Sequence, residues 1–281
     1  MNTGLIKEKE VRVAILSMYR DQESQGMKYL HSILEKQSAA HPEYRLSWKV
    51  FATRKKNELP EPEDFDFFIS TGGPGDPHDG KGLAWENNYF AFLEKIRSDI
   101  ASGQKPKYLF SICHSFQLLC RWLNIAEVVP RPETCFGIFS CKPEQSAKED
   151  PLFSRLPDPF LVVENRNWQC IHPDYEKMNE LGIQVLAREL TPPAPDAEPA
   201  LLALRLSPYW IATQFHPETN PAEMRAVYSA GKKKDEVLEK YGPGKLEEIN
   251  SRLDQQNPAL ADTFHCLLPG FLSEAAAEAL K

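Results

Sequence analysis

Apolar residues in the first half of the chain form short continuous runs, and polar segments with helically spaced apolar residues lie between them. Runs of this length are typical of buried strands, whereas apolar residues three and four apart indicate an amphipathic helix. The alternation predicts an α/β fold with a doubly wound, mostly parallel sheet and right-handed crossovers. The expected strands are residues 11–17, 48–52, the run from Phe65 to Gly72, and 108–112, and the expected helices between them are 27–36 and 85–100.

Between Val128 and Phe215 the apolar runs become shorter and helical spacing becomes scarce. This pattern predicts a β-rich, partly antiparallel flank whose last strand returns to the parallel sheet. A proline-rich segment, 191–199, is expected to be a surface connection. The strands expected in the flank are 136–141, 160–163, 184–187, 200–206 and 209–215.

Helical spacing returns after residue 220, interrupted by the break Gly242-Pro243-Gly244. We therefore expect three parts: a polar N-terminal tail over 1–10, a main domain over 11–220 and a helical extension over 221–281. The extension is interpreted as an appendage packed on the main domain. The alternative is a docking surface for a partner or for a second copy of the chain, which leaves an oligomer open. The helical segments expected in the extension are 221–230, 246–253 and 259–281, with a charged stretch at 232–241.

Cys113 stands where the apolar run 108–112 meets an apolar helical pattern that continues to Leu123. A strand, a tight turn and a helix in this order form an elbow that lifts a nucleophile off the sheet edge. The partial positive charge of a helix N-terminus favours the reactive thiolate of a cysteine placed there. Cys113 is therefore the candidate nucleophile. The alternative is a buried cysteine that only packs between strand and helix.

Two further segments follow predicted strands with residues suited to the same chemistry. Glycines in the turn 72–75 let backbone amides face a ligand, so the turn can supply one N–H group of an oxyanion hole. A histidine two residues before a carboxylate, here His216 and Glu218, can be a general base with its orienting partner. Each segment alone also fits an ordinary glycine turn or a solvated strand end. Because sites in such sheets lie at the carboxyl ends of strands, we expect both segments to meet Cys113.

These three segments, in this order, resemble the class I glutamine amidotransferases, the family with a Cys-His-Glu triad. Residues 111–117, Ser-Ile-Cys-His-Ser-Phe-Gln, are similar to the family's Gly-x-Cys-x-Gly-His-Gln. Residues 72–75 match its Gly-Gly-Pro-Gly turn, and residues 216–218 match its His-Pro-Glu. The resemblance covers roughly residues 11–220. It is closest in character to the stand-alone domains that resemble the amidotransferase half of GMP synthase, and it implies their flavodoxin-like fold.

The resemblance implies a role for each matched position. The implied catalytic residues are a nucleophile, a base and the carboxylate that orients the base, and two backbone N–H groups would form the oxyanion hole. These positions are, for catalysis, Cys113, His216 and Glu218; for the oxyanion hole, Gly73 and His114; and for substrate binding, Gly75 and Gln117.

Departures from the family pattern concern the substrate pocket. Ser111 and Ser115 replace the two elbow glycines, and Phe116 replaces the family histidine before the glutamine. The Ser-His-Gly-Asp stretch of many members is replaced by residues 164–169, Glu-Asn-Arg-Asn-Trp-Gln. Within it, Arg166 is either a bidentate donor to a substrate carboxylate or a surface arginine. The triad is complete but the substrate pocket is altered. The sequence therefore predicts the reaction type better than it predicts the identity of the substrate.

Composition narrows the function classes further. The net charge of −7 over 281 residues argues against general nucleic-acid binding, which prefers a basic face. The chain has no apolar run near 20 residues and no secretory signal at its N-terminus, so we expect no membrane contact and a cytoplasmic protein. The six cysteines then favour free thiols over disulfides. No metal-ligand spacing is present, and no cofactor is expected.

The hypothesis from sequence is therefore a cysteine enzyme that hydrolyses the side-chain amide of glutamine, or a related γ-glutamyl amide, through a Cys113 thioester. Ammonia would pass to a separate synthetase subunit, because no phosphate-binding P-loop appears in the sequence. The first alternative is a stand-alone γ-glutamyl hydrolase of the same fold. The second is a non-catalytic binding or regulatory protein that keeps the fold.

Overall fold

A computed structural model describes residues 9–20, 24–102, 106–194, 196–253 and 258–281. These residues form one nine-stranded sheet in the order β2-β1-β3-β4-β9-β8-β7-β5-β6. The first five strands in this order are parallel. They are β2 (Arg45–Phe51), β1 (Glu10–Leu16), β3 (Phe67–Ser70), β4 (Tyr108–Ile112) and β9 (Trp210–Thr213).

The other half of the sheet is antiparallel and is joined to the parallel half through β9. The predicted combination of a doubly wound parallel sheet with a β-rich flank is therefore confirmed. The antiparallel strands are β8 (Leu201–Ser207), β7 (Gln184–Glu189), β5 (Glu127–Pro143) and β6 (Phe160–Ile171).

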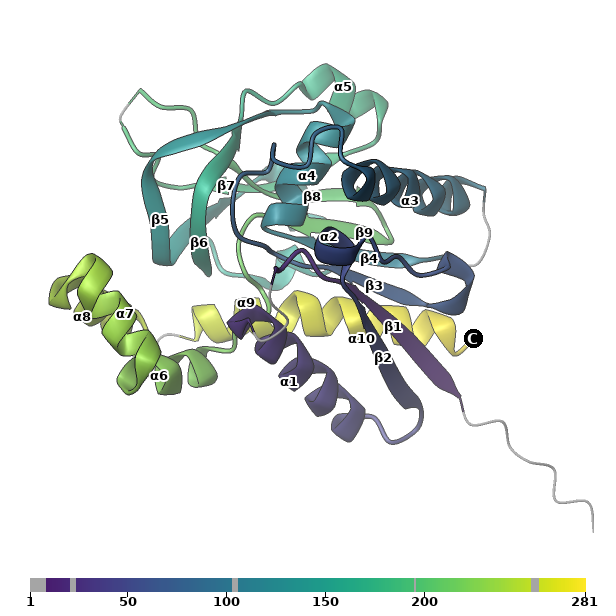
Figure 1. Cartoon of the computed structure of the whole chain (residues 1–281), viewed down its shortest axis with the longest axis horizontal. Helices are drawn as coiled ribbons and strands as arrows, with labels where there is room; N and C mark the ends of the chain where they lie inside the picture. The colour runs from purple at the N-terminus through teal and green to yellow at the C-terminus, as the bar shows by residue number, and fades with distance from the viewer. Residues whose placement is uncertain (1–8, 21–23, 103–105, 195, 254–257) are drawn as a thin grey trace, which may run out of the picture.

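Helices cover both faces of the sheet, and each face has its own apolar core (Figure 1). One face carries the first helix together with the last two, and the other carries three helices from the middle of the chain. On the first face lie α1 (Gln25–Ala40), α9 (Ala259–Cys266) and α10 (Leu268–Ala279). On the second lie α3 (Ala84–Ala101), α4 (His114–Leu123) and α5 (Tyr175–Glu180).

Three helices of the C-terminal extension lie at the side of the molecule, next to the β5–β6 pair (Figure 1). They are α6 (Pro221–Ser229), α7 (Lys232–Tyr241) and α8 (Pro243–Arg252). Their apolar side chains Met224 and Ile249 share a third, smaller core with Ile138 of β5 and Leu161 of β6. The charged stretch 232–241 is thus helical, and the glycine-proline break separates two helices as expected.

The structure differs from the sequence prediction in three places. The expected helix 259–281 is broken at Leu267, because Pro269 cannot donate to the carbonyl one turn earlier and suits the first turn of a new helix. Between the expected strands 48–52 and 65–72 the chain forms the short helix α2 (Thr53–Lys56), which the apolar pattern does not predict. Strands β5 and β6 are longer than their apolar segments, because they continue pairing outside the core, where the apolar pattern gives no signal.

Two expectations fall wholly or partly on residues outside the described ranges. Of the polar tail 1–10, residues 1–8 lie outside them, and so does residue 195 of the proline-rich segment 191–199. Among the described residues, no helix is both long enough and apolar enough to cross a lipid bilayer.

We propose that the extension 221–281 and the main domain 11–220 unfold as one cooperative unit. Phe271 of α10 is fully buried and makes ring contacts with Phe67 of β3, Tyr108 of β4 and Phe110 of β4, at centroid distances of 5.7, 5.2 and 5.9 Å. The last helix therefore contributes an aromatic side chain to the core on that face of the sheet.

Replacing Phe271 by alanine should lower the free energy of unfolding by about 3–5 kcal/mol, because it leaves a cavity against the central strands. Urea denaturation should show one transition for both variant and parent. Leu190→Ala, at a side chain that is 42% exposed, is the control and should change the free energy by less than about 0.5 kcal/mol. A separate transition for the extension would contradict the proposal.

Candidate active site

Cys113 occupies the tight turn between β4 and α4, with φ 49° and ψ −98°. A non-glycine residue at positive φ in this region is strained, at a cost of roughly 1–3 kcal/mol, and persists only where neighbours hold it. Its N–H group donates to the carbonyl of Thr213 at 2.7 Å, and its own carbonyl accepts from the N–H of Gln117 at 3.1 Å. The turn is thus fixed by the end of β9 on one side and by the first turn of α4 on the other.

His216 and Glu218 follow β9, which is the neighbour of β4 in the sheet. The ring nitrogen Nδ1 of His216 is 2.8 Å from the Oε1 atom of Glu218, so Nε2 is the nitrogen left for Cys113, with which the ring also forms a hydrogen bond. The backbone N–H of His216 donates to the carbonyl of Val163 at 2.9 Å, which fixes the start of this segment on β6.

Burial alone would lower the pKa of His216, but the neighbouring charges of Glu218 and Cys113 outweigh burial and raise it well above its usual value. Glu218 is 1% exposed, so its charge acts on the ring with little screening by water. This arrangement favours a protonated imidazole beside the sulfur of Cys113, with the buried carboxylate of Glu218 holding the ring from the other side.

The glycine turn lies against Cys113 and His216. A Cβ atom added to Gly72 would be 3.1 Å from Cε1 of His216, 3.4 Å from Cβ of Cys113 and 3.4 Å from the hydroxyl of Tyr19. A Cβ atom on Gly73 would be 2.5 Å from the carbonyl oxygen of Met18, a contact that no side chain tolerates. Glycine is required at Gly73, where the backbone of Met18 is this close, and the space at Gly72 is tight.

The two serines that replace the family's elbow glycines both form buried hydrogen bonds. The Ser111 hydroxyl accepts from the indole N–H of Trp210 at 3.2 Å. The Ser115 hydroxyl donates to the carbonyl of Thr71 at 2.7 Å and lies 2.8 Å from the hydroxyl of Ser70. Ser115 therefore ties the start of α4 to the residues that lead into the glycine turn, and holds the elbow and the turn in register.

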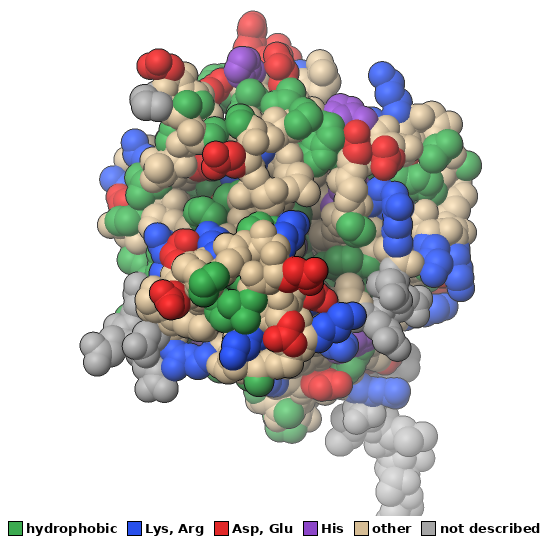
Figure 2. Space-filling view, turned by 60° about the vertical axis from the view of Figure 1, so that its left-hand side comes forward, with side chains coloured by type: hydrophobic (Ala, Val, Ile, Leu, Met, Phe, Trp, Pro, Cys, Tyr) green, Lys and Arg blue, Asp and Glu red, His purple; other side chains and the backbone are tan. Residues whose placement is uncertain are grey.

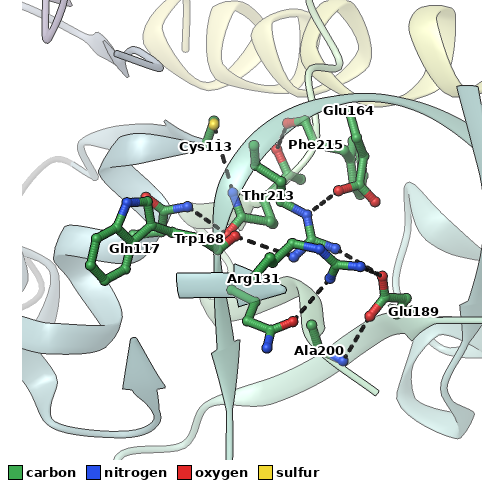
Figure 3. Close-up of polar contacts among 12 residues, drawn as sticks. Cys113, Gln117, Arg131, Glu164, Trp168, Glu189, Ala200, Thr213 and Phe215 are labelled. Atoms are coloured by element: carbon green, nitrogen blue, oxygen red, sulfur yellow. Dashed lines mark hydrogen bonds and ion pairs between the residues drawn. The ribbon is translucent and has the colours of Figure 1, made fainter. Parts of the chain in front are cut away.

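A residue missed by the sequence analysis, Gln214, contacts the candidate nucleophile directly. Its Nε2 atom is 3.6 Å from the sulfur of Cys113, and its Oε1 atom accepts from Nε2 of Gln117 at 3.0 Å (Figure 3). Both amides are buried. The position of Gln214, two residues before His216, was the available signal, but the strand pattern did not say which face its side chain would occupy.

Tyr19 is the second residue without an assigned role in the sequence analysis. Burial, together with the charges of Glu218 and Cys113, raises the pKa of its phenol well above the usual value, so the hydroxyl stays neutral. A Cβ atom on Gly26 would be 2.0 Å from this hydroxyl, which requires glycine there. The polar segment 19–26 fits either a ligand-site loop or a plain connector by its sequence; its residues 21–23 lie outside the described ranges.

His114 contributes a side chain that is buried away from the site cavity. Burial, and after it the positive charges of Arg54, Arg121 and Arg20, lower the pKa of this imidazole to about 3. Neither ring nitrogen has a hydrogen-bond partner among the described residues. The side chain is thus a neutral buried group, and only the backbone N–H of His114 is a candidate for the expected oxyanion hole.

Arg166 is not a surface arginine, which corrects one of the two interpretations of the sequence. It is 3% exposed and forms ion pairs with Glu164 and with Glu189, the latter at 3.2 Å, while Arg131 reaches Glu189 at 2.9 Å (Figure 3). Two cations and two anions therefore balance inside the flank. A third donor of Arg166, Nη1, lies 3.4 Å from the carbonyl of Trp168, so its guanidinium mainly braces β6.

A cavity of about 530 Å³ opens over Cys113. Of the seven site residues expected from the sequence, six line it, and His114 does not. The six are Cys113, His216, Glu218, Gly73, Gly75 and Gln117. The cavity is further lined by Tyr19, Ser24, Gln25, Glu164, Arg166 and Trp168. Within the described ranges, no group of three or more His, Cys, Asp or Glu side chains is arranged to hold a metal ion.

Fold and site together define an α/β protein with a cysteine, a histidine and a glutamate gathered at the carboxyl edge of a parallel sheet. The family model for class-I glutamine amidotransferases matches residues 26–232. The match spans more than half of the sequence, so the chain belongs to the class-I glutamine amidotransferase family. A search of curated proteins finds no match.

Several solved structures share the fold at low sequence identity. A glutamine amidotransferase from Thermotoga maritima is 16% identical with a TM-score of 0.65, over 95% of this chain and 98% of that one. The glutaminase domain of Trypanosoma brucei CTPS with bound acivicin is 15% identical with a TM-score of 0.58, over 95% and 94%. A putative GMP synthase protein from Thermoplasma acidophilum is 17% identical with a TM-score of 0.50, over 75% and 85%.

Replacing Ser115 by alanine should lower the free energy of unfolding by about 1–3 kcal/mol, because the buried carbonyl of Thr71 loses its donor. Urea denaturation measures the change. Ser273→Ala is the matched control, since that hydroxyl only donates to Pro269 within α10, and it should cost less than about 0.5 kcal/mol. Equal losses in the two variants would show that Ser115 does not brace the elbow.

The low pKa of His114 predicts a loss of stability in mild acid. An unfolded histidine takes up its proton near pH 6.5, whereas the folded His114 does so only near pH 3, so acid favours the unfolded chain throughout this window. The free energy of unfolding should change by at most about 1.4 kcal/mol per pH unit for this one group. Between pH 7 and pH 5 the melting temperature should fall less steeply for His114→Leu than for the parent. His265→Leu is the control, because that ring is exposed, and its melting temperature should fall as steeply as that of the parent.

Proposed function

We propose that this protein hydrolyses the side-chain amide of glutamine, or a related γ-glutamyl amide, through a thioester on Cys113. The observation that carries the proposal is that Cys113 and His216 meet beside the glycine turn at Gly72, with Glu218 bonded to the far nitrogen of the His216 ring. Membership of the class-I glutamine amidotransferase family supports the same chemistry.

In the proposed first step, the sulfur of Cys113 attacks the γ-carbonyl carbon, a C–S bond forms and the C–N bond breaks. His216 holds the thiol proton and delivers it to the departing nitrogen, while Glu218 keeps Nδ1 of the ring occupied so that Nε2 faces the reaction. In the second step, water attacks the thioester carbonyl, a C–O bond forms and the C–S bond breaks, and the proton of the water passes through His216 to the sulfur. The products are glutamate and ammonia, or glutamate and an amine.

We assign the oxyanion hole to the backbone N–H groups of Gly73 and His114. One lies in the glycine turn and the other starts α4, so the two sit on either side of the strained cysteine. Donors of this kind contribute on the order of 3 kcal/mol each to transition-state stabilisation in comparable sites. Gln117, Gly75 and Gln214 are proposed to position the substrate and the sulfur, because all three are buried or line the cavity beside Cys113.

If ammonia is the product, the proposal places its acceptor enzyme on a separate polypeptide, as expected from the sequence. The alternative of a stand-alone γ-glutamyl hydrolase is favoured by one observation, the size of the cavity, which exceeds what glutamine alone would fill. Both candidates use the same thioester on Cys113, so one experiment tests the chemistry that they share.

Purified protein should release glutamate from glutamine or from a γ-glutamyl amide, and Cys113→Ala should reduce this release by at least about 10³-fold, because the nucleophile is lost. Enzymatic glutamate detection gives the rate. Cys266→Ala, at a cysteine on α9 outside the cavity, is the control and should keep the parent rate.

Alkylation with iodoacetamide provides a second readout. A working site should make Cys113 react far faster than the other five thiols, because all six are buried but Cys113 alone among them lines the cavity. No release from any γ-glutamyl amide, together with no selective alkylation, would contradict the proposal and favour the non-catalytic alternative.

A further inference from the structure

The cavity over Cys113 extends to a wall made by the C-terminal extension. Helices α6 and α7 contribute Tyr228, Val237 and Tyr241 to its lining, and Phe136 of β5 joins them there. None of these residues belongs to the segments that carry the proposed chemistry. The extension therefore shapes the site itself, besides packing on the domain.

Three aromatic rings form the apolar part of this wall, and we call Phe136, Tyr228 and Tyr241 the aromatic wall. The rings of Phe136 and Tyr241 are stacked, with centroids 4.6 Å apart and an interplanar angle of 5°. Tyr228 meets Phe136 edge-on at 6.3 Å. All three are only half-buried although they pack on one another, so they leave apolar ring surface facing the cavity.

The aromatic wall is held in place by close packing of the extension on β5. Gly137, next to Phe136, has φ +128°, and a Cβ atom there would be 3.3 Å from Lys245 of α8. Below it, Met224 and Ile249 are buried in the small core shared with β5 and β6. Helices α6 and α7, which carry two of the three rings, lie at the side of the molecule that Figure 2 turns toward the viewer.

The cavity is larger than glutamine needs. Its volume of about 530 Å³ lies in the range of about 300–1,000 Å³ typical of sites for drug-sized ligands. Glutamine is much smaller than ligands of that size, so it leaves part of the cavity unfilled. A substrate that fills the site therefore carries a group beyond the glutamyl part.

The charges along the wall favour an anion on that group. Lys233 and Lys240 line the cavity together with Glu236, and Lys233 is paired with Glu236 at 2.7 Å. The ammonium of Lys240 lies 5.0 Å from the ring centroid of Tyr241, and no carboxylate of the described residues lies within ion-pair distance of it. A carboxylate carried by an apolar substrate group could meet this cation beside the aromatic wall.

We propose that the site takes γ-glutamyl dipeptides whose second residue is large and apolar or aromatic. The inference rests on the thioester chemistry proposed for Cys113. The γ-glutamyl carbonyl lies at Cys113, the second side chain packs against the aromatic wall, and its carboxylate faces Lys240. Hydrolysis consumes one water and gives glutamate and a free amino acid, with the thiol proton carried to the amine of that amino acid.

The experiment compares kcat/KM for γ-glutamyl-phenylalanine, γ-glutamyl-glycine and glutamine. The parent protein should prefer γ-glutamyl-phenylalanine by about 10-fold to 100-fold, the range expected for filling an apolar subsite. Tyr241→Ala should remove most of this preference through a higher KM for γ-glutamyl-phenylalanine. Tyr241→Phe keeps the ring and should keep the preference. Tyr175→Ala, at a 49% exposed tyrosine outside the cavity, is the matched control.

A matched substrate tests the cation. Lys240→Ala should raise KM for γ-glutamyl-phenylalanine but not for the same compound with its carboxylate converted to a carboxamide. Thermal melts of each variant show whether the fold is intact. Equal effects on both compounds would remove Lys240 from the proposed site.

The inference and the proposed chemistry fail in different ways. Glutamine hydrolysis without any preference for the larger dipeptide, or equal losses on all substrates in Tyr241→Ala, would overturn the subsite and leave the chemistry standing. If no substrate is hydrolysed, the subsite is tested separately by calorimetry, which measures how tightly γ-glutamyl-phenylalanine binds to Cys113→Ala. Binding to Cys113→Ala that becomes about 10-fold weaker when Tyr241→Ala is added supports the subsite. No binding to Cys113→Ala, or equal binding to the single and the double variant, overturns it.

Discussion

The site depends on one constraint, the strained backbone of Cys113 at the carboxyl end of β4. A residue at φ 49° is held only if its neighbours leave no easier conformation. Those neighbours come from the two strands that flank β4 in the sheet, β3 and β9. Because all three strands are parallel, their carboxyl ends meet at one edge, and the glycine turn and His216 arrive on either side of the sulfur.

Crowding at this edge explains the small and polar residues around it. Gly73 has no room for a side chain and Gly72 has little, whereas Ser115 has room for a hydroxyl that donates to the carbonyl of Thr71. The serine-flanked elbow is therefore a variant in which side-chain hydrogen bonds brace the turn. Gln214 adds a further brace, because its amide bridges Gln117 and the sulfur of Cys113.

The C-terminal extension has two structural roles that differ in position and in chemistry. Helices α9 and α10 complete the apolar core on one face of the sheet, where Phe271 packs on the central strands. Helices α6 to α8 pack beside β5 and β6 and bring tyrosines to the cavity. The first role stabilises the sheet that positions Cys113, and the second sets the volume available to whatever binds there.

The sequence by itself determined the parallel sheet and the antiparallel flank, because short buried strands and helical spacing are local patterns. It also determined the family, because the motifs at 72–75, 111–117 and 216–218 are local as well. It also predicted which segments end at the carboxyl edge, so six of the seven expected site residues line one cavity. Only the tertiary structure decided the contacts of Gln214, Arg166 and the residues of the aromatic wall. These depend on contacts between distant segments, such as Phe136 with Tyr241, and on which face of a strand or helix is buried. A local pattern does not specify such pairings, because they arise only when the sheet and the extension pack together.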